Sequence, residues 1–514
     1  MYPGVFAEQD PDRPACIATD SGEVVTFAEL EERSNQGAQL FRQLGLREGD
    51  CIALYMENNA RFMEICWAAQ RSGLFYTCIA THLTAPEVAY IVADCDARLL
   101  ITSEAKAAVA TELLELLPSS LELFMVGEST ESYSSWEQAA GTQPTQRIAG
   151  ETEGHDFLYS SGTTGRPKGV RIALKGVPLG EDTEFFSKLK AISGNPSEGD
   201  LMYSPAPLYH AAPLRFCMTM HRVGGGCVLP TKFDAQESLR LIEQHRCTHS
   251  LWVPTMFVRM LKLPEDLRRQ YDISSLQAAI HGAAPCPIEV KRAMIDWFGP
   301  VLLEYYGGSE GNGLCLIDSH ETLERPGSVG RGVLGEVRIL DEDQQEVEPG
   351  VDGTVYFAEG FEFEYYKDPD KTDQSRSRQG WTTLGDIGHV DEDGYLYLTD
   401  RKAFMIITGG VNVYPQEVEN RLITHPAVLD VAVFGIPDED FGETVKAVVQ
   451  PMDFEQAGPE LEQTLIAYCR EVLSSVKCPR SIDFDRALPR EANGKLYKRL
   501  LKDRYAGQVT RIVE

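Results

Sequence analysis

Helix-like and strand-like segments alternate over residues 26–102, and this alternation constrains the fold more than any other feature of the chain. Thr26 and Glu29 have the spacing of a capping box, which predicts a helix ending near Leu44. The pattern predicts further helices over 59–72 and 84–93, and strands over 51–56 and 98–102. Short strands separated by helices favour a parallel sheet covered by helices. The sequence therefore predicts an α/β fold.

The pattern changes along the rest of the chain. Residues 127–156 are polar and predict surface loop, and 175–200 show no clear periodicity. Short strands and turns over 327–357 predict a small β-rich subdomain. The end of the chain predicts helices over 416–424, 459–474 and 496–503, and strands over 428–436, 445–450 and 481–485. We expect a large N-terminal domain of helix-covered, mostly parallel sheets with the β-rich subdomain (1–400), and a small mobile α+β C-terminal domain (401–514).

Charge and cysteine usage exclude several classes of function. The net charge of −30 opposes binding to nucleic acid or to an anionic membrane, because both are polyanions. No apolar run approaches the ~18 residues of a membrane-spanning helix, and residues 1–10 do not resemble a signal peptide. The 12 cysteines never form a C-x-x-C pair and are expected to be reduced, mostly buried thiols. These features favour a cytoplasmic enzyme without a transmembrane segment.

Residues 157–170, FLYSSGTTGRPKGV, combine glycines, hydroxyls and cations in one short segment. Glycines let backbone N–H groups approach an oxyanion, hydroxyls donate hydrogen bonds, and Lys168 adds positive charge. The segment is not a Walker A loop, because Pro167 precedes the lysine and Gly169 follows it. The local chemistry favours a phosphate-binding loop, and an ordinary surface loop is the alternative.

The segment from Ser160 to Gly169 resembles the signature of the adenylate-forming superfamily, which includes acyl-CoA synthetases, beetle luciferases and the adenylation domains of peptide synthetases. Further family motifs follow in the family's order along nearly the whole chain. The resemblance implies that this segment binds the phosphates of ATP, with Thr163 as a weaker second ligand of Mg²⁺. The phosphate-binding residues it implies are Ser160, Ser161, Gly162, Thr163, Thr164, Gly165 and Lys168.

Residues 303–311, LEYYGGSEG, resemble the family's Y-G-x-[ST]-E element. The resemblance places Tyr306 near adenine, Ser309 beside the phosphates, and Glu310 on Mg²⁺, a cation that prefers carboxylate and phosphate oxygens. The segment HGAAP at 281–285 resembles the family's adenine-binding loop. Further nucleotide-binding residues implied in the same way are Gly282, Ala283, Ala284, Glu304, Tyr305 and Gly307.

Two other glycine patterns suggest different functions. Residues 307–311 match G-x-S-x-G, the nucleophile elbow of serine hydrolases, but the residues that follow lack a helical pattern. Gly330, Gly332 and Gly335 match G-x-G-x-x-G, but they precede a strand rather than a helix. We therefore keep the hydrolase only as a minor alternative, and we interpret Gly330, Gly332 and Gly335 as turns.

Three charged residues complete the nucleotide site that the resemblance implies. Asp386 matches the aspartate that binds the ribose hydroxyls, and Arg401 matches the arginine near the ribose and phosphates. Lys495 matches the catalytic lysine of adenylate formation, where a cation offsets the charge that develops on the phosphates. The family rotates its small domain between the two steps of the reaction. Ala403 and Phe404 depart from the family pattern at this hinge.

The resemblance also implies sites for coenzyme A and for the acid. Gly409 and Gly410 match part of the coenzyme A tunnel, and His210 matches a gate between this tunnel and the acyl pocket. The acyl pocket would be lined by Tyr209, His210, Trp252 and Gly308. Since Gly308 stands where larger side chains are common in the family, we expect it to leave room for a bulky acid.

Together these features predict an ATP-dependent acyl-CoA synthetase that uses Mg²⁺ and coenzyme A. They also allow a homodimer. The small residues of the pocket segments favour a fatty or bulky apolar acid. An aromatic or short branched acid is the alternative substrate, and a carrier-protein thiol is the alternative acceptor. A member of the family that only binds nucleotide is a further alternative, although Glu310, Asp386 and Lys495 are all present.

Overall fold

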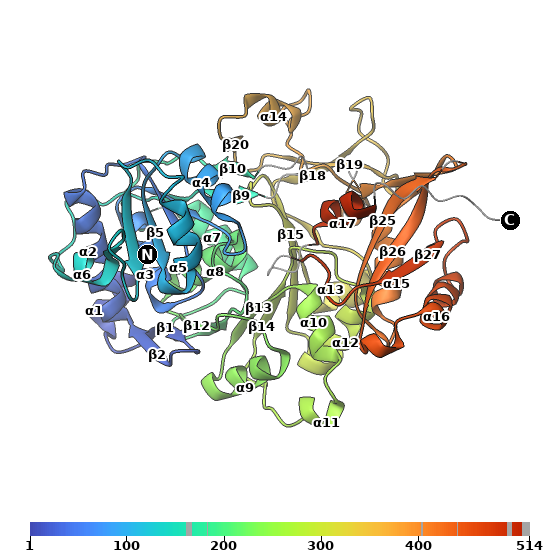
Figure 1. The fold of residues 1–514 in the computed structure, drawn as a ribbon, viewed down its shortest axis with the longest axis horizontal. Helices are drawn as coiled ribbons and strands as arrows, with labels where there is room; N and C mark the ends of the chain where they lie inside the picture. The colour runs from blue at the N-terminus through green and yellow to red at the C-terminus, as the bar shows by residue number, and fades with distance from the viewer. Residues whose placement is uncertain (161–166, 182, 402–403, 439, 491–495, 506–514) are drawn as a thin grey trace.

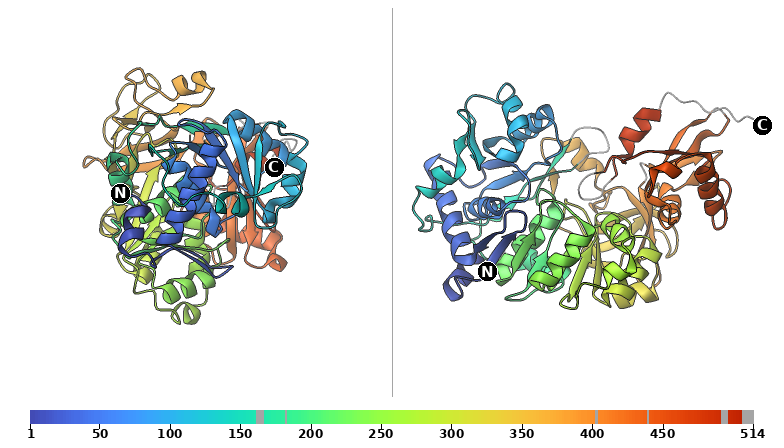
Figure 2. Two further views of the ribbon diagram at one scale, coloured as in Figure 1. Left: turned by 90° about the vertical axis from the view of Figure 1, so that its left-hand side faces the viewer. Right: turned by 60° about the horizontal axis from the view of Figure 1, so that its bottom comes forward.

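The structure is a computed structural model that describes residues 1–514 apart from 161–166, 182, 402–403, 439, 491–495 and 506–514. The described residues form a large lobe and a C-terminal lobe. The large lobe comprises the described residues of 1–401, and the C-terminal lobe comprises those of 406–505. Figures 1 and 2 show the C-terminal lobe, in orange and red, at the opposite end of the molecule from the blue N-terminal sheet.

The first sheet of the large lobe has 6 strands, and all of its strand pairs are parallel. Their order is β7 (Ser134–Ser135), β6 (Glu122–Val126), β5 (Ala97–Ser103), β3 (Cys51–Tyr55), β4 (Phe75–Cys78) and β8 (His155–Asp156). The helices of this region are α1 (Pro3–Gln9), α2 (Phe27–Gln43), α3 (Ala60–Arg71), α4 (Ala85–Asp94), α5 (Ala107–Leu113) and α6 (Trp136–Gly141). The predicted alternation of helices and parallel strands is confirmed.

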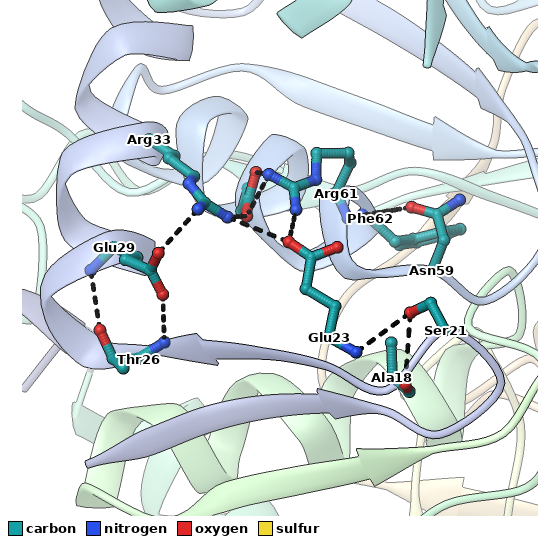
Figure 3. Close-up of polar contacts among 10 residues, drawn as sticks. Ala18, Ser21, Glu23, Thr26, Glu29, Arg33, Asn59, Arg61 and Phe62 are labelled. Carbon is teal, nitrogen blue, oxygen red and sulfur yellow. Dashed lines mark hydrogen bonds and ion pairs between the residues drawn. The ribbon is translucent and has the colours of Figure 1, made fainter. Parts of the chain in front are cut away.

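Helix α2 begins where the capping-box pattern predicts it. Thr26 accepts a hydrogen bond from the backbone N–H of Glu29, and the Glu29 carboxylate accepts one from the Thr26 backbone N–H (Figure 3). Arg33 of α2 and Arg61 of α3 both pair with Glu23. These charges connect the two helices to Glu23, the first residue of strand β2 (Glu23–Thr26).

The second sheet of the large lobe has 9 strands and lies in the middle of the molecule (Figure 1). Its order is β17 (Arg331–Leu334), β16 (Leu314–Asp318), β15 (Leu302–Gly307), β14 (Ala278–His281), β13 (His249–Trp252), β11 (Leu201–Tyr203), β12 (Gly226–Leu229), β1 (Pro14–Ala18) and β2 (Glu23–Thr26). The six strands from β15 to β1 pair in parallel, whereas β16, β17 and β2 are antiparallel additions at the edges. A mostly parallel sheet places the loops that follow its strands along one edge.

Several helices of this region pack on the nine-stranded sheet and divide the hydrophobic core. The helices of the region are α7 (Thr183–Ile192), α8 (Ala211–Val223), α9 (Ala235–His245), α10 (Pro254–Leu261), α11 (Glu265–Arg268), α12 (Ile288–Phe298) and α13 (Ser319–Glu324). Helix α11 has no buried residue. One core cluster joins α3 and α8 to the sheet through Trp67, Phe216 and Ile280. A second joins α9, α10 and α12 to it through Leu239, Phe257 and Met294. The two clusters hold the sheet between two layers of helices.

Two small antiparallel sheets complete the large lobe. The first has the order β20 (Glu364–Tyr365), β10 (Lys168–Arg171) and β9 (Leu158–Ser160). The second has the order β18 (Glu336–Leu340), β19 (Gly353–Ala358), β21 (Asp386–Val390) and β22 (Leu396–Arg401). Helix α14 (Pro369–Gln374) follows β20. Strands β18 and β19 of this four-stranded sheet cover part of the β-rich subdomain predicted over 327–357, but the sheet continues to Arg401, and β17 belongs to the nine-stranded sheet.

The C-terminal lobe is built on a sheet of 5 strands with its own core. Its strands are β23 (Ile406–Thr408), β24 (Val411–Val413), β25 (Val428–Asp438), β26 (Gly442–Pro451) and β27 (Ser481–Phe484), and its helices are α15 (Pro415–Ile423), α16 (Pro459–Arg470) and α17 (Lys498–Tyr505). The predicted boundary between Asp400 and Arg401 lies at the end of β22. The mixed α+β organisation agrees with the sequence pattern.

Two segments differ from their sequence-based interpretation. The stretch 127–156 was expected to be surface loop, yet it contains α6, whose Trp136 is buried against Phe41 and Phe124. The stretch 175–200 contains α7, which packs on α8. In the first case a single tryptophan anchors a short helix, which is too short to give a periodic pattern.

All 12 cysteines are free and buried, as predicted. Within the part of the chain that the structure describes, no helix has both the length and the apolar character needed to cross a membrane.

Candidate active site

The predicted site residues of the large lobe gather at the carboxyl edge of the nine-stranded sheet. His281 ends β14 and Gly307 ends β15. His210, the N-cap residue of α8, lies in the loop after β11. Because ligands of parallel α/β sheets bind outside the carboxyl ends of the strands, this edge is where a nucleotide site is expected. Segments that are far apart in the sequence are thus brought to one edge.

Tyr306 and Asp386 form a direct hydrogen bond, although they lie on different sheets. The Tyr306 hydroxyl donates to Asp386 Oδ2 at 2.6 Å, and the Tyr306 ring stacks on Phe357 at 6.2 Å. Asp386 is 6% exposed. In the register of β21 and β22, Asp386 lies opposite Arg401, so the backbone brings these two predicted residues together as well. A hydrogen-bonded aspartate beside an aromatic ring suits the binding of ribose and adenine.

Glu310, the predicted ligand of Mg²⁺, is held by a tyrosine. The Tyr365 hydroxyl donates to Glu310 Oε1 at 3.0 Å, and the two residues are 8% and 7% exposed. No group of three or more His, Cys, Asp or Glu side chains arranged to hold a metal occurs among the described residues. A single carboxylate nevertheless fits Mg²⁺, which completes its octahedron with waters and substrate phosphates rather than with a protein cage.

Lys168, the predicted phosphate-binding cation, lies on β10 beside the same tyrosine. Its Nζ pairs with Asp368 Oδ2 at 2.9 Å and lies 6.0 Å from the centre of the Tyr365 ring. Asp368 is the N-cap residue of α14 and accepts a hydrogen bond from the backbone N–H of Lys371. Lys168 is therefore available to an anion that replaces this one partly exposed carboxylate.

Arg215 is a site residue that the sequence analysis missed. Its guanidinium donates to Asp156 through Nε and Nη2, at 2.8 Å for the shortest contact, and Nη2 also donates to the carbonyl of Ser309 at 3.2 Å. Burial alone would raise the pKa of Asp156, but the charge and hydrogen bonds of Arg215 lower it. The ion pair thus supports the backbone between the predicted phosphate and metal residues. Its sequence signal is an arginine within the mostly apolar first part of α8.

The space beside Gly282 is filled by a side chain of the protein. A methyl group at Gly282 would lie 2.6 Å from Cε1 of Tyr305, whose ring packs edge-on against Phe216 at 5.6 Å. The neighbouring Ala283 has φ +67°, a conformation uncommon for a residue with a side chain. The predicted adenine loop is therefore a tight, strained turn packed on an aromatic pair.

The expectation that Gly308 leaves room for a bulky acid is wrong. A methyl group at this position would lie 2.5 Å from Leu384 Cδ1 and 2.6 Å from Glu310 Oε2. Leu384, which precedes Asp386 in the chain, fills the space that the glycine leaves. Gly308 thus allows close packing of the Glu310 carboxylate and Leu384.

The side chains of Trp252 and Glu304 lie away from this group. Trp252 is 1% exposed and packs in the core cluster of α9, α10 and α12, with its Nε1 donating to Ser250 Oγ. It does not line an acyl pocket with His210. Glu304 is paired with Lys291 inside the protein, where burial raises its pKa and the lysine opposes this rise. The Glu304 carboxylate is therefore buried in an ion pair and does not face the candidate site.

Tyr209 and His210 lie together at the start of α8, with ring centres 4.5 Å apart. Tyr209 is 6% exposed, whereas His210 is only partly buried. Because Phe216 lies on the same helix and contacts Tyr305, α8 connects the predicted gate to the loop at Gly282.

Gly409 and Gly410 form the turn between β23 and β24 on the C-terminal lobe, with φ +55° and +79°. Three apolar side chains around this turn are exposed, namely Ile407 at 52%, Val411 at 42% and Phe441 at 36%. The Gly409 N–H donates to the carbonyl of Phe441. The structure therefore presents the predicted coenzyme A segment on an exposed apolar surface.

The large lobe and the C-terminal lobe contact each other away from the turn at Gly409. His82 Nε2 and the Tyr497 hydroxyl are 3.3 Å apart, with their ring centres at 6.1 Å. Lys262 Nζ donates to the carbonyl of Val428. Tyr497 lies two residues after Lys495, which is itself outside the described residues.

Several predicted residues cannot be placed. Ser161, Gly162, Thr163, Thr164 and Gly165 lie outside the described residues, as do Lys495 and the hinge residue Ala403. Ser160 and Arg401 are described by their place in β9 and β22 only. Their roles stay predictions.

Comparison with known proteins identifies the family. The family model for AMP-binding enzymes matches residues 5–366, and the model for the AMP-binding enzyme C-terminal domain matches 417–495. A feruloyl-CoA synthase of Amycolatopsis sp. is 31% identical over 96% of both chains, and the long-chain-fatty-acid–CoA ligase FadD13 of Mycobacterium tuberculosis is 30% identical over 98% of this chain and 97% of its own. The crystal structure of an anthranilate CoA ligase with anthranoyl-AMP matches with a TM-score of 0.82 and 26% identity, over 98% of this chain and 97% of that one. The chain therefore belongs to the AMP-binding enzyme family, in the branch of the acid–CoA ligases.

Proposed function

We propose that this chain uses ATP to convert a carboxylic acid to an acyl-adenylate and then transfers the acyl group to coenzyme A. The proposal is supported by two observations: Lys168 and Glu310 both lie beside Tyr365, and Tyr306, which shares the segment 303–311 with Glu310, is hydrogen-bonded to Asp386. These residues provide a cation for phosphates, a carboxylate for Mg²⁺ and a hydrogen-bonded site for the nucleoside.

In the first step a carboxylate oxygen of the acid attacks the α-phosphorus of ATP. The bond from this phosphorus to the bridging oxygen breaks, and pyrophosphate leaves with the electron pair. Negative charge builds up on the phosphates, so Lys168 stabilises the transition state by its charge, and Lys495 is proposed to do so from the C-terminal lobe. Glu310 would hold Mg²⁺, which supplies further positive charge to the phosphate oxygens when it is bound.

In the second step the sulfur of coenzyme A attacks the acyl carbonyl, and AMP leaves with the oxygen that came from the acid. The turn at Gly409 and Gly410 is proposed to guide the pantetheine arm, with His210 beside the acyl carbonyl. The exposed apolar side chains around this turn support a second position of the C-terminal lobe, in which they pack against the large lobe.

The acid is proposed to be apolar. Apolar or aromatic side chains lie beside both glycines, with Tyr305 and its neighbour Phe216 at Gly282 and Leu384 at Gly308. The Glu310 carboxylate also lies beside Gly308 and is the proposed ligand of Mg²⁺. Arg215, the cation next to Phe216 in the chain, is ion-paired with Asp156. A charged group on the acid would therefore meet no free partner in this group of side chains, which favours a fatty or other bulky apolar acid.

An aromatic acid is the second candidate. Leu384 fills the space at Gly308, so the pocket is shorter there than the glycine suggests. The edge-on pair of Phe216 and Tyr305 provides ring faces and edges against which a flat acid can pack.

A panel of acids tests both candidates. Pyrophosphate release is measured with ATP and Mg²⁺ for medium- and long-chain fatty acids, aromatic acids, acetate and amino acids, and the products formed with coenzyme A are identified by mass spectrometry. We expect the highest kcat/KM for a fatty or aromatic acid and an acyl-CoA product. Highest kcat/KM for acetate or an amino acid contradicts the apolar pocket. A product formed only with a carrier-protein thiol contradicts the coenzyme A step.

A further inference from the structure

One short segment outside the known motifs contacts the carboxylate of the metal site. Strand β20 pairs antiparallel with β10, which places Tyr365 opposite Val170. From this position the Tyr365 hydroxyl reaches Glu310 Oε1 at 3.0 Å. The contact links a residue of the small three-stranded sheet to the loop after β15.

The Tyr365 side chain is held rigidly. It packs with Phe363 at 5.4 Å between ring centres and belongs to a small core cluster with Val170 and Phe363. Its backbone N–H donates to Thr372 Oγ1 at 3.0 Å. A phenol fixed in this way has little freedom to follow a moving carboxylate, so it imposes its geometry on Glu310.

The Glu310 carboxylate is confined on its other side as well. Its Oε2 lies 2.6 Å from the position that a methyl group at Gly308 would occupy. The backbone before it is held by the hydrogen bond from Arg215 to the Ser309 carbonyl. Thus Oε1 accepts from the phenol, while Oε2 lies beside the glycine and is left for other partners.

We propose that Tyr365 is a positioning residue that orients Glu310 for the Mg²⁺ of the Mg²⁺–ATP complex. The inference rests on the proposed role of Glu310. By occupying Oε1, the phenol fixes the carboxylate rotamer and directs Oε2 toward the cation. Partners of this kind, which contact a ligand rather than the metal, typically contribute about 10- to 100-fold to metal affinity.

The experiment measures equilibrium ATP binding by calorimetry, without acid and without turnover, in Mg²⁺ and in EDTA. The Mg²⁺-dependent gain in affinity is the quantity compared. We expect Tyr365→Phe to reduce this gain about 10-fold and to change binding in EDTA little. The matched control is Tyr366→Phe, because the Tyr366 hydroxyl donates to Asp96 at 2.7 Å, away from Glu310. This control should retain the full gain.

Two further variants keep the outcomes separate. Gly308→Ala places a methyl group against Oε2 and should reduce the Mg²⁺-dependent gain from the other side, whether or not Tyr365→Phe folds. Glu310→Gln should abolish most of the gain. The inference is overturned if Glu310→Gln loses the gain while Tyr365→Phe keeps it. If Glu310→Gln also keeps it, the proposed metal role of Glu310 fails, and the inference fails with it.

Discussion

The residues proposed to bind the nucleotide and the turn proposed to bind coenzyme A differ in how far neighbouring side chains hold them. In the large lobe, Glu310, Asp386 and Lys168 are each hydrogen-bonded or ion-paired to a side chain from another strand or loop. In the C-terminal lobe, Gly409 and Gly410 lie on an exposed turn with apolar side chains around it. The residues proposed for the nucleotide are thus held by neighbouring side chains, whereas the turn proposed for coenzyme A is exposed.

Under the proposed mechanism, this arrangement belongs to adenylate formation. The contact between His82 and Tyr497 holds the chain just after Lys495 against the large lobe. The turn at Gly409 takes no part in that contact. We therefore expect variants near Lys495 to affect pyrophosphate release and variants of the turn at Gly409 to affect acyl transfer.

The largest effect is expected for Lys495→Ala. Removing a cation that offsets charge in the transition state should slow pyrophosphate release about 100- to 1,000-fold. Acyl transfer from supplied acyl-adenylate to coenzyme A should continue near the normal rate. Both steps are measured separately by rapid quench. Equal losses in the two steps would remove the distinction between the regions.

A second effect is expected at the exposed turn. Gly410→Val puts a side chain on a residue with φ +79° that has no neighbour within 4 Å. Acyl transfer should slow about 10-fold, because small displacements of a positioned reactant are costly, while pyrophosphate release stays unchanged. Gly394→Val is the matched control, with φ +80° and equally open space. If the control slows transfer as much, the cause is backbone strain and not the coenzyme A path.

A smaller effect is expected for the contact between the lobes. His82→Phe and Tyr497→Phe each remove the hydrogen bond but keep an aromatic ring, and each should slow pyrophosphate release about 2- to 5-fold. Acyl transfer from supplied acyl-adenylate should be unaffected. The double variant should be no slower than either single one, since both remove the same interaction. Additive losses would show that the two residues act independently.

The smallest effect concerns pH. Burial lowers the pKa of Lys262 to about 8 from 10.5 in this arrangement, opposed by the charge of Asp430, and His425 is a further titratable neighbour. Because the lowered pKa belongs to the docked lobe, docking releases a proton, and it becomes more favourable as pH rises between these values. Pyrophosphate release should therefore rise across this window relative to Lys262→Met. A falling ratio has the wrong sign for this explanation.

Much of the fold was predictable because its signals are local. The capping box at Thr26 and the asparagine N-cap at Asn59 depend on neighbouring residues, and both helices begin where the pattern predicts. The helix at Trp136 was missed because one buried tryptophan stabilises it through contacts with Phe41 and Phe124, which are distant in sequence.

The site was predictable only in part. Motifs identified Glu310, Tyr306 and Asp386, and the structure brings the last two into contact. The partners Tyr365 and Arg215 have no motif, because their roles arise from sheet pairing and helix packing. Gly308 was misinterpreted for a related reason. An absent side chain in the sequence does not say whether space remains, and here Leu384 fills it.

The most direct test of the account follows an oxygen atom. An acid that the panel identifies as a substrate is labelled with ¹⁸O in its carboxylate and converted with ATP, Mg²⁺ and coenzyme A. We predict that AMP carries one labelled oxygen from the acid and that pyrophosphate carries none. Unlabelled AMP, or label appearing in pyrophosphate or in inorganic phosphate, would contradict attack of the acid on the α-phosphorus.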